Sequence, residues 1–365
     1  MNRSLAVLVV AGCAALVGCS VEDTQSQNDC CSAPNGGRDI GNGPSTEAPT
    51  GPAGKSPSGT PTGPNPGGQQ KIAGKLTAGV WDDNLNFDFF SKYLEQSKSM
   101  QGVSIFSDLE RKNARERAKQ GGAKAELDVA IVLDTTSSMT DEIAYLQVEF
   151  DAIAKTVKDR FPQTTPRFGL VVYRDEGDEY VTRATPFTAD VAAFRAALAA
   201  QSSGGGGDIP EAVPEGITAG VNLDWRTTSD VARLMFWVAD APQHPGTETA
   251  VNSAVRGAVG KGIHVYPVAA SGTNPSAELT MRATAQVTGG RYIFLTDDSG
   301  VGDSHAEPHI PCYAVTPLQG AIVRMVESEM RGVRVEPAAS EVIRLVGSPE
   351  SGRCILRDQS QVVLY

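Results

Sequence analysis

Three catalytic signatures are absent from this sequence. It contains no H-E-x-x-H pair of zinc hydrolases and no turn that presents a nucleophilic serine between two glycines. The four glycines at 204–207 are not followed by G-K-[ST], so they do not make a phosphate-binding loop. No residue stands out as a general base for hydrolysis either. We therefore expect a protein that is not an enzyme.

An excess of basic residues is absent as well. The 365 residues include 32 Lys and Arg against 43 Asp and Glu, a formal net charge of −11 at pH 7, and the acidic residues are spread along the chain. This charge disfavours binding to nucleic acid or to an anionic membrane surface through a basic patch. It suits the attraction of cations.

Long apolar runs are scarce, and the first of them is a targeting segment. Asn2 and Arg3 give a short positive start, and Leu5–Gly18 is a run of apolar and small residues. Its length matches the core of a signal peptide and falls short of the roughly 20 residues that span a bilayer. The run ends in LVGC, which resembles the lipobox of bacterial lipoproteins. This resemblance implies that residues 1–18 are a signal peptide and that Cys19 is acylated; the alternative is a chance cysteine in an ordinary signal peptide.

Such a lipid would anchor the mature chain to the bacterial cell envelope. Ser20, rather than an Asp, follows the cysteine, which by the bacterial sorting pattern implies the outer membrane, on its periplasmic or its outer side. Residues 19–70 are rich in Gly, Pro, Ser, Thr, Asn and Gln and contain hardly any large apolar side chain. They cannot bury enough surface to fold, so we interpret them as a disordered tether with a reach of roughly 40 Å.

Cysteine is also scarce, with six residues in the chain. Cys13 would be lost with the signal peptide, and export would place the others in an oxidising compartment. We expect Cys312 and Cys354 to form an intrachain disulfide that ties the tail to the preceding domain. Cys30 and Cys31 are adjacent, and they pair with each other, bond to another chain or stay free; the spacing does not decide among these.

The most informative stretch is LDVAIVLDTTSSMTDEI, residues 127–143. It begins as a buried strand whose apolar run stops at Asp134, and hydroxyl residues follow. An amphipathic helix comes next, because apolar residues are then spaced three and four apart: Ile143, Leu146, Phe150, Ile153 and Val157. A carboxylate and several hydroxyls therefore lie on the turn between a central strand and a helix, where open α/β sheets bind ligands.

Asp134, Thr136 and Ser138 form the pattern D-x-T-x-S on that turn. Side chains two residues apart on a tight loop can converge on one point. A carboxylate and two hydroxyls are hard oxygen ligands, which suit Mg²⁺, Mn²⁺ or Ca²⁺. The alternative is that Thr136 or Ser138 only caps the helix.

Strands and helices alternate through the following residues. We expect a mostly parallel, doubly wound α/β sheet over 126–331, covered by helices on both faces. A helical segment at 71–125 and a short β-rich tail at 332–365 would flank it as small extensions. The strands after the first are expected at 167–173, 180–184, 232–239, 263–269 and 291–295.

Two later stretches join the D-x-T-x-S pattern: SSGGGGDIPE at 202–211 and LMFWVADAPQH at 234–244. In this order, on these elements, the three motifs resemble the metal-ion-dependent adhesion site of von Willebrand factor type A domains, whose first motif is D-x-S-x-S. The resemblance implies a Rossmann-like sheet and a bound Mg²⁺, or Mn²⁺ or Ca²⁺. It also implies the ligands: Asp134, Thr136, Ser138, Asp208 and Asp240.

Asp208 departs from the family pattern, in which a Thr is more usual at this place. An extra carboxylate would lower the net positive charge of the bound metal and weaken its pull on an acidic ligand. The alternative reading is a helix start, because Asp208-x-x-Glu211 has the form of a capping box and Pro210 suits a first helical turn.

Other acidic residues lie close to the three motifs in the sequence. Asp141 and Glu142 resemble the integrin β-subunit version of the site, in which acids here hold an adjacent Ca²⁺; the alternative is that they only complement the dipole of a helix first turn. The run at 175–179, DEGDE, either concentrates cations or is a solvated hairpin tip. His244 is the last residue of the third motif, beside the expected site; we expect a loop residue, and the alternative is a contact with the ligand.

These observations predict a membrane-anchored, divalent-cation-dependent protein-binding module of the adhesion type. The family resemblance implies that a protein partner offers an Asp or Glu carboxylate to an open position on the metal. The alternative is a structural or assembly lipoprotein of the envelope whose metal only stabilises the fold. A hydrolytic activity of the cation site is the third possibility, and it lacks a general base.

Overall fold

The computed structural model describes residues 71–80, 106–118, 121–308, 310–350, 353–355 and 361–363. These residues belong to one compact unit that spans 67–365. The signal peptide, Cys19, the tether, Cys30 and Cys31 lie outside the described residues. No helix within the described part has the length and hydropathy needed to cross a membrane.

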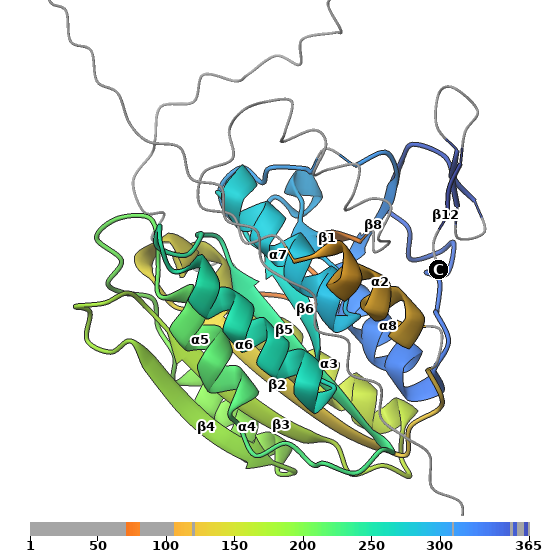
Figure 1. Ribbon diagram of the computed structural model, residues 1–365, viewed down its shortest axis with the longest axis horizontal. Coiled ribbons are helices and arrows are strands. Elements are labelled where there is room, and N and C mark those ends of the chain that lie inside the picture. The colour runs from red at the N-terminus through yellow and green to blue at the C-terminus, as the bar shows by residue number, and fades with distance from the viewer. Residues whose placement is uncertain are drawn as a thin grey trace, which may run out of the picture. The chain divides into compact units, whose positions relative to one another are not determined.

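A nine-stranded sheet forms the centre of this unit (Figure 1). Five neighbouring strands, β3, β2, β5, β6 and β7, run parallel, and antiparallel strands complete both edges. This arrangement confirms the predicted doubly wound α/β class. In spatial order the strands are β4 (Thr182–Thr188), β3 (Arg167–Tyr173), β2 (Glu126–Asp134), β5 (Val231–Ala239), β6 (His264–Ala269), β7 (Ile293–Leu295), β1 (Thr77–Val80), β8 (Tyr313–Pro317) and β9 (Arg344–Val346).

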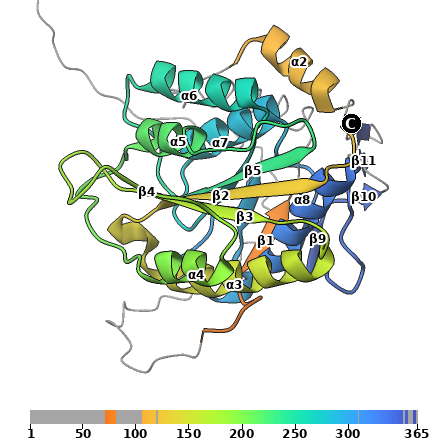
Figure 2. The same ribbon diagram turned by 90° about the horizontal axis from the view of Figure 1, so that it is seen from below.

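Helices cover both faces of the sheet (Figure 2). One apolar core lies under α3 (Thr140–Arg160), α4 (Val191–Ala199) and α8 (Leu318–Arg331). The other lies under α5 (Val213–Val221), α6 (Glu248–Lys261) and α7 (Pro275–Thr288). Strand β2 is buried on both sides because its alternate residues enter the two cores: Leu127, Val129, Ile131 and Leu133 enter the first, and Ala130 and Val132 the second.

The N-terminal extension contributes a strand as well as a helix. Strand β1 lies between β7 and β8 and pairs antiparallel with both. Its Gly79 is required there, because a Cβ on this residue would lie 2.2 Å from the ring of Phe294. Helix α2 (Asp108–Ala118) lies on the side of α6, where Glu110 pairs with Arg256. The TAGV strand is too short to show an alternation of apolar and polar residues, so the sequence did not predict it.

The C-terminal tail divides between two sheets. Strand β9 forms an edge of the main sheet, next to β8. The strands β10 (Pro349–Glu350), β11 (Arg353–Ile355) and β12 (Gln361–Val363) make a small antiparallel sheet of their own. A disulfide joins Cys312 and Cys354, with 5.8 Å between their Cα atoms, so the expected covalent link between tail and domain is present.

Candidate cation site

The D-x-T-x-S turn forms a compact hydrogen-bonded group at the carboxyl end of β2. Asp134 ends the strand, and its Oδ1 accepts hydrogen bonds from the backbone N (2.9 Å) and the Oγ1 (2.7 Å) of Thr136. Thr136 Oγ1 lies 3.2 Å from Ser138 Oγ. Neither Thr136 nor any residue at the start of α3 caps a helix through its side chain. The hydroxyls therefore face the carboxylate, and the capping alternative does not describe them.

Asp240 brings a second carboxylate to this turn. It directly follows β5, the strand next to β2, and its side chain is largely buried and hydrogen-bonded to Ser138. Burial, together with the nearby charge of Asp240, raises the pKa of Asp134 to about 7. Burial likewise raises the pKa of Asp240. The structure thus brings together Asp134, Thr136, Ser138 and Asp240. They come from the two loops that follow β2 and β5, at the carboxyl ends of these strands.

The glycine-rich loop is tied to this turn through its backbone. Ser137 Oγ donates to Gly205 O at 2.7 Å. Gly206 N donates to Asp178 Oδ2 at 2.9 Å, and the same oxygen accepts from Asp175 N at 3.1 Å. The acidic 175–179 run therefore holds the glycine-rich loop through a hydrogen bond. Gly205 and Gly206 have φ of +75° and +65°, a conformation that suits glycine.

Asp208, the residue expected from this loop, is not buried with the other carboxylates. It is exposed, whereas helix α5 begins only at Val213. Asp208 is not the cap of a helix, because α5 begins five residues later and its N-cap is Ala212. The capping-box reading is wrong for the same reason.

Glu211, three residues further on, is buried next to the turn, since Glu211 Oε1 and Thr136 both lie beside Gly206. Its side chain is 2% exposed, and its backbone N donates to Pro242 O at 3.0 Å, which ties the second loop to the third. Burial and the charges of Asp134 and Asp175 raise its pKa to about 9. Glu211 belongs to the same GGGGDIPE motif, in which the capping-box alternative gave it only the role of a cap partner.

The donor set fits a cation. In the described residues, five carboxylate oxygens are buried without a hydrogen-bond partner, and three of them belong to these loops: Asp134 Oδ2, Asp240 Oδ1 and Glu211 Oε2. Buried acids without partners are costly, and a bound cation would satisfy them. In the described ranges no three His, Cys, Asp or Glu side chains are grouped as a ready-made metal centre. A cation here would therefore draw further ligands from the hydroxyls of Thr136 and Ser138 and from water.

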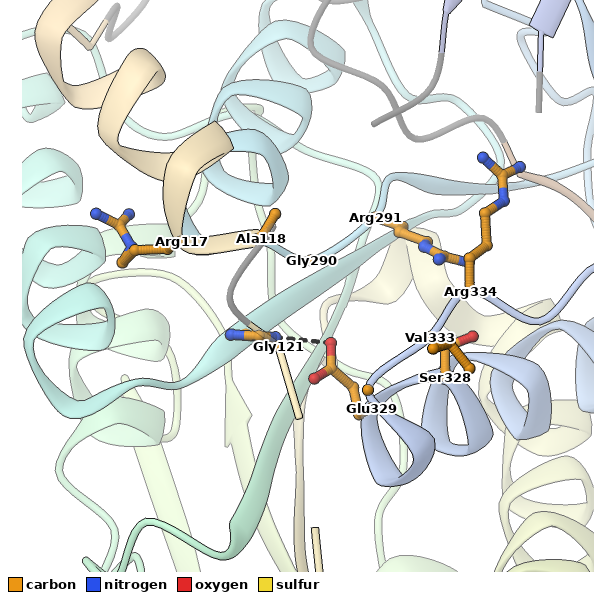
Figure 3. A pocket seen from close by; sticks show the side chains of 12 residues that line it. Arg117, Ala118, Gly121, Gly290, Arg291, Ser328, Glu329, Val333 and Arg334 are labelled. Carbon is orange, nitrogen blue, oxygen red and sulfur yellow. Dashed lines mark hydrogen bonds and ion pairs between the residues drawn. The ribbon is translucent and has the colours of Figure 1, made fainter. Parts of the chain in front are cut away.

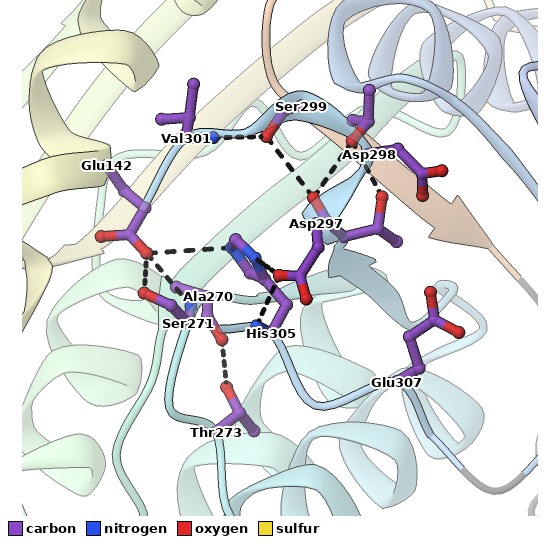
Figure 4. A network of polar contacts seen from close by, with 12 residues as sticks. Glu142, Ala270, Ser271, Thr273, Asp297, Asp298, Ser299, Val301, His305 and Glu307 are labelled. Atoms are coloured by element: carbon purple, nitrogen blue, oxygen red, sulfur yellow. Dashed lines mark hydrogen bonds and ion pairs between the residues drawn. The ribbon is translucent and has the colours of Figure 1, made fainter. Parts of the chain in front are cut away.

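Asp141 and Glu142 separate instead of forming a second pair. Asp141 is exposed. Glu142 is buried, and its Oε1 accepts a hydrogen bond from Ser271 N at 3.1 Å (Figure 4). His305 Nε2 lies 3.9 Å from the same oxygen, and His305 Nδ1 is 2.9 Å from Asp297 Oδ1. This network joins α3 to the loops after β6 and β7, so Glu142 has a role in holding loops together.

His244 pairs with an acid near the site. Its Nε2 lies 2.6 Å from Asp175 Oδ1, so it joins the third loop to the acidic 175–179 run. The expectation of a loop residue agrees with this position.

Comparison with known proteins supports the fold assignment. Residues 128–297 match the family of the von Willebrand factor A domain. The matched residues contain the parallel strands β2, β3, β5, β6 and β7 of the sheet described above. No curated protein matches the chain.

Two solved structures illustrate the similarity. The conserved hypothetical protein BatB from Bacteroides thetaiotaomicron is 15% identical, with 56% of this chain and 98% of that chain covered and a TM-score of 0.40. The pilus adhesin SpaC from Lactobacillus rhamnosus GG, in its open conformation, is 13% identical, with 49% of this chain covered and a TM-score of 0.38. The chain spans 29% of that adhesin.

Proposed function

We propose that the protein is a divalent-cation-dependent protein-binding module, displayed on the bacterial cell envelope by a lipid on Cys19. The match to the von Willebrand factor A family supports an interaction module. The observation that carries the cation dependence is the group of buried carboxylate oxygens without partners at the carboxyl edge of the sheet. Carboxylates in such surroundings call for a positive charge, because burial favours their neutral form.

Asp134 and Asp240 would hold the cation together with the hydroxyls of Thr136 and Ser138. Mg²⁺ suits this set, and Mn²⁺ or Ca²⁺ are the alternatives. When bound, the cation would supply the positive charge to which a partner protein offers an Asp or Glu carboxylate. We propose no catalytic activity for this site, because no side chain in it is placed as a general base toward a substrate.

A second candidate function follows from the burial of the turn. Asp134 is 0% and Thr136 1% exposed, so a cation held here also stabilises the fold. In that case the protein is a structural or assembly lipoprotein of the envelope, and its partner contacts do not depend on the metal.

Calorimetric titration of Mg²⁺, Mn²⁺ and Ca²⁺ into the EDTA-stripped full chain in detergent tests the cation site. We expect saturable binding that Asp134→Asn abolishes. Asp303→Asn, which changes an exposed acid, is the matched control and should bind as the wild type does. A folded wild-type chain that binds none of the three cations would overturn the proposal.

Partner binding separates the two candidate functions. Proteins captured from envelope extracts should be released by EDTA and missing with Asp134→Asn. Equal capture with and without the cation, in a chain whose unfolding midpoint the cation raises, would favour the structural role. Labelling with radioactive palmitate, expected for the wild type and lost in Cys19→Ser, tests the lipid anchor.

A further inference from the structure

We propose that a cavity at the amino ends of the parallel strands binds a small dissolved oxyanion of the sulfate or phosphate type, through His264, Arg117 and Arg291. His264 is the first residue of β6, whereas the carboxylates of the cation site follow the last residues of their strands. The two sites therefore lie at opposite ends of the sheet, and the anion site does not depend on the proposed function.

The cavity has the size and the lining that such an ion needs. Its volume is about 140 Å³, many times the roughly 15 Å³ that one water molecule needs. The end of α2, the start of β6, the turn between α7 and β7 and the end of α8 form its wall. Figure 3 shows Arg117 on one side and Arg291 and Arg334 on the other, with Glu329 between them. Arg334 pairs with Glu336 at 2.8 Å, and the charge of Arg291 acts on Glu329.

His264 is the central donor of the cavity. Its Nδ1 lies 2.6 Å from Glu329 Oε1, so this carboxylate fixes the orientation of the ring. Its Nε2 faces the turn between α7 and β7, where a Cβ built on Gly289 would be 3.6 Å away from it. Burial alone would lower the pKa of His264, but the charge and hydrogen bond of Glu329 outweigh burial, and the pKa lies above its usual value. A charged ring donates a hydrogen bond from Nε2 into the cavity.

Two further basic side chains act on His264 and have neutral acceptors. The charges of Arg117 and Lys124 both reach the imidazole ring. Arg117 Nη2 donates to Val287 O at 2.8 Å, and Lys124 Nζ donates to Ser229 O at 2.8 Å. Backbone carbonyls satisfy these donors without balancing their charge.

A charge count shows what the fold itself balances. Helices α7 and α8 end at the cavity, and each helix end carries about half a negative charge, which basic groups complement. Together with Glu329 they supply about two negative charges. Arg117, Lys124 and the protonated ring of His264 supply three positive charges. About one positive charge is left, and an oxyanion in the cavity would balance it.

Calorimetric titration of sodium sulfate into the full chain in detergent, with the ionic strength held constant by chloride, tests the site. We expect saturable binding that is at least about tenfold weaker in His264→Gln and in Arg117→Gln, because each variant loses a charged donor. Arg195→Gln is the matched control, since it removes the same charge from an arginine of α4 that pairs with Asp151. It should bind sulfate as the wild type does.

The pH dependence of binding excludes a merely structural role for His264. Sulfate carries the same charge throughout the range in which histidine titrates, so any pH dependence reports the protein. The other charged groups that face the ring are Glu329, Arg117, Lys124 and Arg291, and none of these residue types titrates near neutral pH. The affinity of the wild type should fall as the pH rises through the titration of His264, and His264→Gln should lack this dependence.

Thermal unfolding gives a second readout. Sulfate stabilises folded proteins in general, and this effect is common to all variants. The rise of the unfolding midpoint with sulfate should therefore be larger in wild type and Arg195→Gln than in His264→Gln. A folded wild-type chain that shows no saturable binding of sulfate or phosphate would overturn the inference. Equal affinities in wild type, His264→Gln and Arg117→Gln would overturn it as well, because the anion would then bind elsewhere.

Discussion

Two aspartates at opposite ends of β2 have opposite surroundings. Asp128 and Asp134 are both fully buried. Burial raises the pKa of Asp128, but hydrogen bonds from Arg167 and Arg226 outweigh it, and the resulting pKa is below the usual value. Asp134 has no arginine partner, its pKa is raised to about 7, and one of its oxygens has no hydrogen-bond partner. The same side chain on the same strand is neutralised at one end and left without a counter-charge at the other.

At the amino ends of the strands, by contrast, charged side chains have partners. A cavity of about 140 Å³ there is lined by Arg117, Arg291 and Arg334 (Figure 3). Arg117 donates to Val287 O at 2.8 Å, in the last turn of α7, and His264 Nδ1 lies 2.6 Å from Glu329 Oε1. Basic groups near helix C-termini stabilise the fold. Arginines therefore neutralise acids at the amino ends of the strands, whereas the acids at the carboxyl ends have no arginine partner among the contacts described above.

The largest effect is expected from substitutions of the two aspartates of β2. Asp128→Asn should destabilise the cation-free protein by about 3 kcal/mol, because it leaves two arginines without their buried partner. Asp134→Asn should instead stabilise the cation-free protein, because it removes an uncompensated buried charge. Chemical unfolding in EDTA measures both. Changes of the same sign would show that the two aspartates have equivalent surroundings.

Gly206→Ala tests the glycine-rich loop, which packs against the carboxylates at the ends of the strands. The residue has φ +65°, and a new Cβ would meet both Thr136 and Glu211. We expect about 1–3 kcal/mol of lost stability and at least about tenfold weaker cation binding by calorimetry, because the carboxylates are displaced. Gly207→Ala is the control, since its Cβ would meet nothing within 4 Å. Equal affinities in the two variants would contradict the geometry.

The pH dependence of stability should differ between wild type and Glu211→Gln. The pKa of Glu211 rises from 4.5 to about 9 on folding, so the folded state holds this proton more tightly than the unfolded state. In EDTA the wild type should therefore lose stability relative to Glu211→Gln as the pH rises from about 4.5 to about 9. Added Mg²⁺ should reduce the difference. Parallel unfolding curves across this range would argue against the buried position of Glu211.

Asp208→Asn should have the smallest effect. The side chain is exposed, so stability should change by less than about 0.5 kcal/mol. Calorimetry should give a cation affinity within about twofold of wild type. A loss comparable to that of Asp134→Asn would restore Asp208 to the ligand set.

The regular elements could be read from the sequence because their signals are local. The apolar runs of β2, β3 and β5 and the periodicity of α3 placed these elements within a residue or two of their observed bounds. Strands β1 and β8 were not predicted, because short strands carry little periodicity. Strand β1 also depends on the fit of Gly79 against Phe294, and these two residues are far apart in the sequence.

Local sequence patterns were enough to predict the α/β class, the D-x-T-x-S turn, and the position of Asp240 at the end of a buried strand. These features follow from patterns within single segments, and parallel strands bring their carboxyl ends to one edge. That Glu211 is buried and Asp208 exposed became visible only in the folded chain. This difference depends on how the glycine-rich loop is held by Ser137, Asp178 and Pro242, and burial of a side chain by contacts from three loops is not encoded in the spacing of one motif.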